Sequence, residues 1–304
     1  MNDHLMRLAF GAMAPRTVDR LFERYGDEEA ITEAIRRGRT KASGHTVAAV
    51  AVSAKQRRDE LAALDVTLVS SDGSGFPERL IVFPGHPRWL FVRGSDSRSP
   101  AIGIVGTRTC TRYGIDLATA YGEVAAVRGW SVVSGLARGI DGAAHTGATN
   151  AGGHCQAVLG SGIDVVYPRS HRALHTSVLG TGGVVISEFP PGTPPEGWRF
   201  PTRNRIIAGL SDVLLVVEAG LKGGALITAR IALDYGVPVY AVPGDIDRVA
   251  SVGTNLLIRD GAFPILGPED LAEVLSLLEP LYTTRNDTDE RLAVSRDSAT
   301  DPQL

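Results

Sequence analysis

Six short apolar runs between residues 100 and 244 limit the fold of this chain more than any other feature. They read AIGIVGT, SVVSGL, QAVLGSG, GVVISEF, DVLLVVEA and VPVYAVPG, and stretches of helical character separate them. Continuous Val, Ile and Leu without polar alternation are typical of strands covered on both faces. Such strands alternating with helices indicate right-handed crossovers in a mostly parallel sheet. The sequence therefore predicts a doubly wound α/β fold.

The residues before this region have a different character. Residues 1–70 are predicted to form a small helical domain, in which TVDRLFERYG repeats apolar residues at helical spacing and ends at Gly26, a C-cap. A second helical run, TVAAVAVSAKQRRDELAAL, precedes the strand-like VTLVS. Residues 71–100 are rich in Pro, Gly and Ser and predict a connector with one short strand, WLFVRG. The sheet domain is then expected over residues 101–280.

Charge is distributed unevenly along the chain. Residues 268–304 hold nine acids and three arginines, a net charge of −6, so the remainder carries +3 of the total of −3. This weak basic excess argues against indiscriminate coating of nucleic acid, and any anion site must come from clustered cations. Residues 281–304 are polar and acidic, which predicts a disordered tail.

The same composition argues against several other classes of protein. No apolar run approaches the length that spans a bilayer, and no secretory segment is evident, so a cytoplasmic location without membrane insertion is expected. The cysteines, Cys110 and Cys155, lack the spacing of a disulfide framework or a zinc site. Neither a metal nor a cofactor is predicted.

Glycines, small hydroxyl residues and cations follow the predicted strands. Because ligands of open parallel sheets bind at the carboxyl ends of the strands, these residues form a candidate anion-binding edge. In chain order they are Gly106, Thr107, Arg108, Ser134, Gly135, Arg138, Gly139, Gly160, Ser161, Gly162, Lys222, Gly223 and Gly224. A single such turn is more often structural, but several turns on one edge favour binding.

The stretch WRFPTRNR after the fourth strand adds Arg203 and Arg205 to the same edge. These two arginines are the best candidates for a phosphate clamp. Trp198 and Arg199 at the start of the stretch are predicted to lie in a solvated loop.

Two common phosphate-binding motifs are missing. The turn after the first strand, from Gly103 to Arg108, is not GxGxxG, and the second strand ends at Ser134 rather than at an acid that would hold a ribose, which disfavours NAD. The sequence contains no GxxxxGK[ST], so a P-loop nucleotide hydrolase is also excluded.

Candidate catalytic residues are few. Asp141 and His145 lie four residues apart on one predicted helix, either as an acid–base pair or, as we favour, as residues that cap the helix and tie down the preceding turn. Glu188 and Glu218 both end strands, but nearby cations would keep both ionised, which suits salt bridges better than acid catalysis. A protein that is not an enzyme is therefore predicted.

Seven segments in order resemble the DprA/Smf family of DNA-processing proteins. They are AIGIVGTR, VVSGLARGIDGAAHTGA, VLGSGIDVVYPRSHRAL, ISEFPPGTPP, FPTRNRIIAGLSDVLLVVEA, GALITARIALDYGVPVYAVPG and SVGTNLLIRDGA. The resemblance covers about residues 76–263, and the N-terminal helices resemble the family's SAM-like domain. It implies a Rossmann-like domain that binds single-stranded DNA, forms a homodimer, and loads the RecA recombinase in natural transformation or related recombination.

The resemblance also assigns residues by motif. The phosphate contacts that it implies come from Arg108, Arg172 in YPRSHRAL, and the FPxRNRI residues Arg203, Asn204 and Arg205. The glycines that it places along the groove are Gly135, Gly139, Gly160 and Gly162.

The chain departs from the family pattern in three places. The run Gly223-Gly224-Ala225 replaces a segment that usually reads SGSLIT, which removes a hydroxyl. The N-terminal hairpin GxG reads GAM, and residues 281–304 are too short for the winged-helix domain of many members. Functions that depend on a winged-helix domain are not implied.

Two alternatives stay open at this point. Tyr167, Trp198 and Phe200 are candidates for base stacking, although aromatic residues beside prolines more often pack under loops. A nucleotide-binding sensor or nucleotide hydrolase is the alternative function, because proteins of related sheet architecture carry PGGxGTxxE. Here only GLKGGALITA is present, and it lacks the glutamate.

Overall fold

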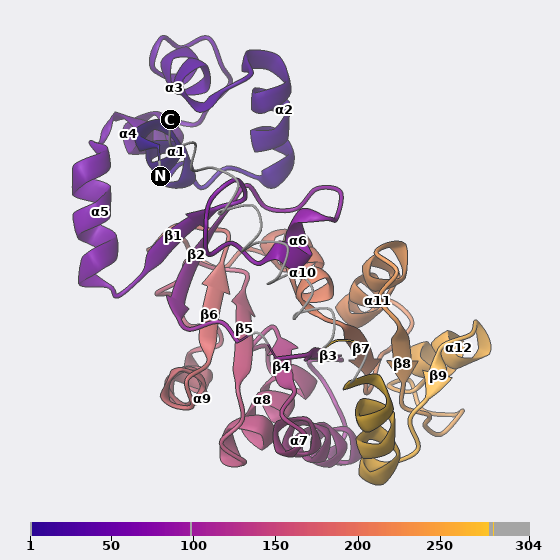
Figure 1. Cartoon of the computed structure of the whole chain (residues 1–304). Coiled ribbons are helices and arrows are strands. Elements are labelled where there is room, and N and C mark those ends of the chain that lie inside the picture. The colour runs from indigo at the N-terminus through magenta and orange to yellow at the C-terminus, as the bar shows by residue number, and fades with distance from the viewer. Residues whose placement is uncertain (1, 98, 280–281, 283–304) are drawn as a thin grey trace, which may run out of the picture.

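The computed structural model describes residues 2–97, 99–279 and 282. Its centre is a nine-stranded sheet in the order β1-β2-β6-β5-β4-β3-β7-β8-β9 (Figure 1). Strand β2 pairs antiparallel with both β1 and β6, whereas all pairs from β6 to β9 are parallel. The predicted α/β fold with a mostly parallel sheet is therefore confirmed.

The six apolar runs predicted to be strands are all strands, from β3 to β8. The sheet consists of β1 (Thr67–Ser70), β2 (Trp89–Gly94), β3 (Ala101–Val105), β4 (Ser131–Ser134), β5 (Cys155–Leu159), β6 (Val184–Ser187), β7 (Val213–Val216), β8 (Val239–Ala241) and β9 (Phe263–Pro264). The sequence also predicted β1 and β2 but not β9, which is two residues long and exposed on both.

Helices precede the sheet and separate its strands. They are α1 (Asp3–Ala9), α2 (Pro15–Tyr25), α3 (Glu28–Arg36), α4 (Gly44–Ala51), α5 (Ala54–Ala63), α6 (Glu78–Ile81), α7 (Arg112–Val127), α8 (Ile140–Asn150), η1 (Arg169–His171), α9 (Arg172–Gly180), α10 (Arg199–Leu210), α11 (Gly224–Asp234) and α12 (Val252–Arg259). Residues 268–279 are also helical.

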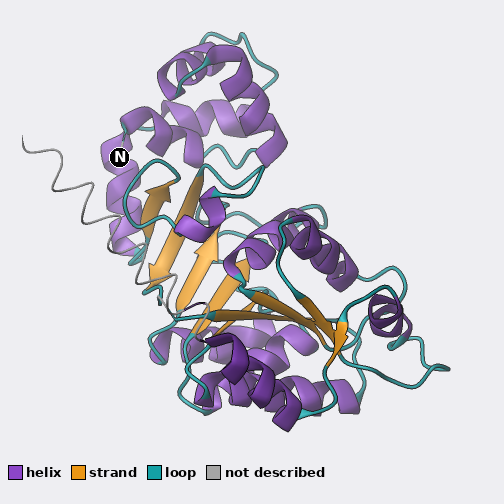
Figure 2. Cartoon of the chain, turned by 45° about the vertical axis from the view of Figure 1, so that its right-hand side comes forward, coloured by secondary structure: helices purple, strands orange, loops and turns teal. Residues whose placement is uncertain are grey.

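The two faces of the sheet are covered by different helices, and the alternation of side chains along each strand separates two cores. Ile102 and Ile104 of β3 belong to the core cluster shared with α7, α8 and α9. Ala101 and Val105 point to the opposite face and belong to the cluster shared with α10 and α11. Helices α1–α5 group beyond the β1–β2 end of the sheet (Figure 2), where Phe10 packs edge-on against Phe91 at 5.5 Å.

One helical prediction needs correction. The run from residue 46 to 64 is two helices, α4 and α5, rather than one. Val52 is extended (φ −67°, ψ 142°), and the side chain of Ser53 accepts a hydrogen bond from the backbone N–H of Gln56 as an N-cap. The serine side chain therefore starts a new helix in the middle of the apolar pattern. The predicted C-cap at Gly26 is present, with φ 88°.

The domain limits 1–70, 71–100 and 101–280 remain predictions, although β1 and β2 of the first two segments join the same sheet as the third. The predicted tail, residues 281–304, lies outside the described residues except for Tyr282. Its ring packs edge-on against Trp130, and its hydroxyl donates to the Asp212 carbonyl at 3.1 Å. None of the described helices is long and apolar enough to cross a membrane.

Candidate functional site

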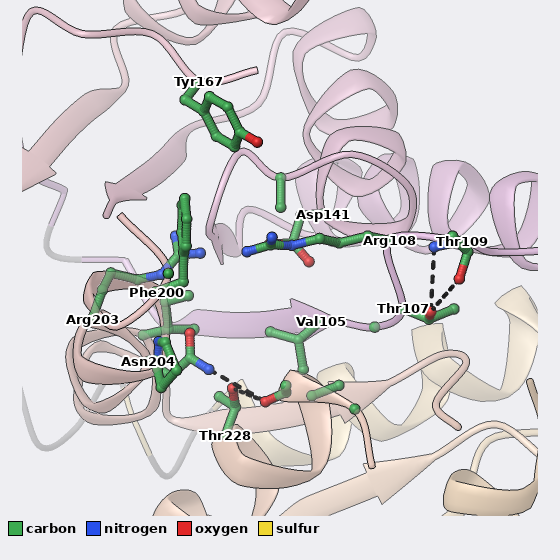
Figure 3. Close-up of a pocket in the computed structure, with 18 of the residues that line it drawn as sticks. Val105, Thr107, Arg108, Thr109, Asp141, Tyr167, Phe200, Arg203, Asn204 and Thr228 are labelled. Carbon is green, nitrogen blue, oxygen red and sulfur yellow. Dashed lines mark hydrogen bonds between the residues drawn. The ribbon is translucent and has the colours of Figure 1, made fainter. Parts of the chain in front are cut away.

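A cleft of about 620 Å³ opens where the carboxyl end of β3 meets the N-termini of α10 and α11 (Figure 3). The β3–α7 loop forms one wall and residues 195–207 form the other. Seven of the predicted site residues line it, namely Gly106, Thr107, Arg108, Arg203, Asn204, Gly223 and Gly224. The structure thus brings together residues from three separate segments of the chain, namely the β3–α7 loop, α10 and the start of α11.

A narrow crevice continues from the cleft along the ends of β4 and β5. Arg108, Tyr167 and Phe200 line both hollows. Four more of the predicted residues, Gly135, Arg138, Gly160 and Ser161, line the crevice alone.

The remaining six predicted residues line neither hollow: Ser134, Gly139, Gly162, Arg172, Arg205 and Lys222. Ser134 is buried, and its hydroxyl donates to the Ile104 carbonyl at 2.6 Å. Arg172 and Lys222 are exposed elsewhere on the surface.

Two glycines of this group serve close packing instead. Gly139 has φ 79°, and a Cβ there would lie 2.4 Å from the Thr107 carbonyl oxygen. A Cβ on Gly162 would lie 2.6 Å from the Pro190 carbonyl oxygen. Both therefore shape loops at the strand ends rather than contact a ligand.

Arg108 is the exposed cation at the mouth of the cleft. Its guanidinium carbon lies 4.5 Å from the centre of the Phe200 ring, and the Tyr167 ring lies 5.6 Å from the same ring. Figure 3 shows the Arg108 side chain extended across the cleft toward Phe200 and Arg203. Arg108 makes no ion pair with any residue that the structure describes. The arrangement presents an exposed positive charge beside two aromatic rings, with the buried Asp141 carboxylate as the nearest negative charge in the cleft.

Arg203 lines the same cleft but is buried, with 3% of its surface exposed. Its guanidinium donates to the Val158 carbonyl and lies against Gly135, where a Cβ would come within 2.1 Å of it. Burial lowers the pKa of Arg203 to about 10, although the nearby Asp141 carboxylate opposes this, so the side chain stays charged at neutral pH. Arg203 thus combines a structural role with a fixed charge at the wall of the cleft.

The structure does not bring Arg205, the other arginine of the predicted clamp, to the cleft. Its guanidinium donates to Glu188 at 2.7 Å and to the Gly85 carbonyl at 2.9 Å. Burial alone would lower the pKa of Arg205, but the Glu188 carboxylate outweighs burial and raises it. Arg205 is therefore held in a structural ion pair.

For Asp141 and His145, the prediction that they tie down the turn is confirmed for Asp141, whereas the prediction that they cap the helix is wrong. Asp141 accepts a hydrogen bond from the Gly135 N–H at 3.1 Å and so ties down the β4–α8 turn, and burial raises its pKa. The N-cap of α8 is Gly139, without a side-chain cap. His145 is fully buried, which lowers its pKa to about 4 and keeps the ring neutral at pH 7.

Glu218, like Glu188, accepts hydrogen bonds from other residues of the protein. It is 3% exposed and accepts hydrogen bonds from the backbone N–H and the hydroxyl of Thr111, at 2.9 and 2.5 Å. Thr111 is the N-cap of α7, so this carboxylate stabilises the start of that helix. Neither Glu188 nor Glu218 lines the cleft.

Sequence reasoning missed some of the cleft and misjudged one arginine. Thr228 lines the cleft, and both it and Asn204 donate to the Gly224 carbonyl at 3.2 Å. Its position four residues after Gly224 on a helix was the available signal. The solvated-loop prediction is wrong for Arg199, which is 6% exposed and donates to the Pro194 carbonyl, whereas Trp198 is 41% exposed.

The sequence model of one family, described as DNA recombination-mediator protein A, matches residues 67–276. The chain belongs to this family. Among its members, Protein Smf of Escherichia coli K12 is 43% identical over 210 residues, which are 68% of this chain and 56% of that protein. The DNA processing protein DprA of Bacillus subtilis is 40% identical over 200 residues, 65% of this chain and 67% of that protein. The chain thus spans little more than half the length of the Smf relative.

Solved structures of the DprA/Smf family share the fold. DNA processing protein A of Streptococcus pneumoniae superposes with a TM-score of 0.73 at 28% identity, covering 89% of this chain and 97% of that one. The Helicobacter pylori protein superposes with a TM-score of 0.62 at 25% identity, covering 69% and 95%, and its structure is described as showing a single-stranded DNA binding mode. The family is one of recombination mediators rather than of enzymes, in agreement with the sequence prediction.

Proposed function

We propose that this chain binds single-stranded DNA along the strand-end cleft and delivers it to the RecA recombinase in DNA uptake or homologous recombination. The observation that carries the DNA-binding part is Arg108, an exposed cation without a carboxylate partner, beside the rings of Phe200 and Tyr167. Membership of the recombination-mediator family and the described DNA binding of the Helicobacter pylori relative support the same proposal.

A single strand offers both groups that this cleft is suited to contact. The guanidinium of Arg108 can donate two parallel hydrogen bonds to one phosphate. The charge of the buried Arg203 adds electrostatic attraction for the same phosphate. Unstacked bases can lie against aromatic rings, and Tyr167 is 38% exposed beside Phe200. In a duplex the bases are stacked and paired, so this second contribution is lost.

The alternative function, a nucleotide sensor or hydrolase, gains no support from the site. The two candidate carboxylates, Glu188 and Glu218, are hydrogen-bonded to Arg205 and Thr111 and do not line the cleft. An acid catalyst or base must reach the reacting atom. No described residue in the cleft other than Asp141 carries a carboxylate, and Asp141 is bonded to the Gly135 N–H.

The proposed homodimer would use a different face. Large apolar side chains are exposed around the β9 edge of the sheet, namely Ile246, Val249, Phe263 and Leu266 at 92, 80, 64 and 76%. A second copy of the chain covering this group would remove apolar surface from water. The RecA partnership rests on the family alone, and it requires a cytoplasmic site of action.

The test is a salt-titrated comparison of single- and double-stranded oligonucleotides. Arg108→Ala should weaken single-strand binding and make the slope of log affinity against log salt shallower by about 0.7, the value for one phosphate contact on a single strand. Arg230→Ala is the matched control, because Arg230 is an exposed arginine of α11 outside both hollows. Equal affinity of wild type and Arg108→Ala at every salt concentration would contradict the proposal.

A further inference from the structure

A second hollow, of about 660 Å³, lies between the N-terminal helices and the segment that joins β6 to α10. On the N-terminal side Phe10, Ser43, His45 and Arg57 line it, and on the other side it is lined by Pro190–Pro194, Glu196 and Arg199. No motif in the sequence pointed to it, because its two walls are about 150 residues apart in the chain.

The second hollow and the strand-end cleft share one loop. Pro195, Gly197 and Phe200 line the cleft, whereas Pro194, Glu196 and Arg199 line the second hollow. The segment from Pro194 to Phe200 therefore contributes to the walls of both spaces. Trp198 lies in it with 41% of its surface exposed, and its ring packs edge-on against Phe189 at 5.7 Å. Trp198 thus belongs to the segment that both hollows share, although it lines neither of them.

The walls of the second hollow contain two arginines with incomplete hydrogen bonding. Arg199 has 7% of its side chain exposed and pairs with Glu196 at 3.3 Å, and Arg57 has 14% exposed and pairs with Glu60 at 2.7 Å. The Nε atoms of both are buried and lack an acceptor. A buried donor without an acceptor costs free energy, which an anionic ligand reached by a small side-chain movement would recover.

The loop before α4 adds two cations that make no ion pair with a described carboxylate. Lys41 and Arg39 lie in the α3–α4 loop, two and four residues before Ser43 of the lining, and both side chains are exposed. Neither they nor His45 make an ion pair with any residue in the described part of the chain. The loop that leads into the lining residues Ser43 and His45 thus carries two exposed cations.

The N-terminus of α4 adds a partial positive charge beside the second hollow. Ser43 is its N-cap and accepts from the Thr46 N–H at 3.1 Å, which leaves the N–H groups of Gly44 and His45 without an acceptor among the described residues. The N-terminus of a helix carries a partial positive charge and attracts phosphates. Ser43 and His45 both line the hollow, so this helix end faces the same space.

We propose that the N-terminal helices hold a second nucleic-acid subsite, so that a single strand in the cleft continues over Trp198, through the second hollow, and onto Lys41 and Arg39. This inference rests on the proposed single-strand binding. A single strand fits because it bends across a loop and offers a base to Trp198, whereas a duplex is too stiff to follow so short a turn. On the shared loop Glu196 is paired with Arg199, so the exposed, unpaired cations Arg39 and Lys41 of the α3–α4 loop supply the additional phosphate contacts.

The experiment compares oligothymidylates of two lengths, about 6 and about 20 nucleotides, a range that brackets the site sizes of single-strand-binding domains. The double variant Arg39→Glu with Lys41→Glu should bind the short strand as wild type does. It should bind the long strand on the order of tenfold more weakly at low salt, with a shallower salt slope by about 1.4 for two lost phosphate contacts. Both replaced side chains are exposed, so the fold should persist.

The matched control places the same kind of change elsewhere. Arg230→Glu, on the exposed side of α11, should leave the discrimination between the two lengths unchanged. Trp198→Ala should weaken the long strand more than the short one, because the indole lies beyond the cleft.

The possible results distinguish failure of the second subsite from failure of the proposed single-strand binding. If the wild type binds the short strand, and the double variant binds the long strand as tightly as wild type does, the second subsite is overturned while the cleft remains. That result would also be expected if the second hollow received an acidic protein segment. If the wild type binds neither length, the proposed function itself fails.

Discussion

The ends of β3 and β6 show how the same residue type serves opposite purposes. Both strands lead into loops that carry arginines. After β3, Arg108 remains exposed, stacks over the Phe200 ring, and makes no ion pair with a described carboxylate. After β6, Arg203 is 3% exposed and Arg205 is paired with Glu188. The number of arginines at a strand end is therefore a poor guide to the charge available to a ligand.

The cause lies in where each loop becomes a helix. Helix α7 begins at Arg112, after a loop that stays on the surface. Helix α10 begins at Arg199, so Arg199 and Arg203 occupy the same face one turn apart, and this face packs into the protein. Ile206, Ile207 and Leu210 bury the rest of it. Arginines that lie on a helical face packed into the core are therefore buried together with that face.

The largest expected effect is on the buried side of this comparison. Arg203→Ala should lower the free energy of unfolding by about 3–5 kcal/mol, because it leaves the buried Asp141 carboxylate without its cation and the Val158 carbonyl without a donor. Urea denaturation measures this. Arg108→Ala is the control and should change stability by no more than about 0.5 kcal/mol, as for exposed surface positions. Equal losses of stability for the two substitutions would contradict the distinction between a buried structural arginine and an exposed one.

The free energy of unfolding is also expected to depend on pH through His145, which is buried as Arg203 is. Its pKa of about 4 in the fold lies below its value in the unfolded chain, so between pH 6.5 and 4 the unfolded state binds the extra proton. The stability present above pH 6.5 should therefore fall on acidification by up to about 3 kcal/mol.

The measurement is urea unfolding at several pH values between 7 and 4, for wild type and for His145→Gln. Asp141, whose pKa burial raises, gives a slope of opposite sign in both proteins, so the difference between them isolates His145. A wild-type curve parallel to that of the variant would show that the histidine does not titrate in this way.

The smallest of the three effects is the coupling between Arg205 and Glu188. A double-mutant cycle with Arg205→Ala and Glu188→Gln should give an interaction energy of about 1–3 kcal/mol, because the pair is mostly buried. Single-strand affinity per folded molecule should stay within about twofold for Arg205→Ala, since this side chain lines neither hollow. A loss of affinity as large as that of Arg108→Ala would show instead that Arg205 contributes to DNA binding.

Much of the fold could be predicted because its signals are local. Continuous apolar runs identified the strands β3–β8, and glycine at position 26 identified a helix end. The break between α4 and α5 was missed, because Ser53 interrupts an apolar pattern that otherwise continues. The two-residue strand β9 was missed because it is too short to show any periodicity.

The candidate site could be predicted only to the level of an edge of the sheet. Thirteen of the predicted residues come from the turns after the parallel strands, and parallel strands end on one side, so their proximity follows from topology. Their exposure does not. Arg203, Arg205 and Arg199 differ in burial and in partners although they lie within seven residues of one helix.

The sequence by itself determined the α/β class, the parallel strands, the family and the edge on which the candidate anion-binding residues lie. Only the tertiary structure decided which cations are free, because that depends on carboxylates distant in the chain, such as Glu188 for Arg205 and Asp141 for Arg203. It also created the second hollow, whose walls meet through the packing of the N-terminal helices near the segment after β6. Periodicity and motifs record what a residue contributes locally, whereas burial and charge pairing depend on segments that only folding brings together.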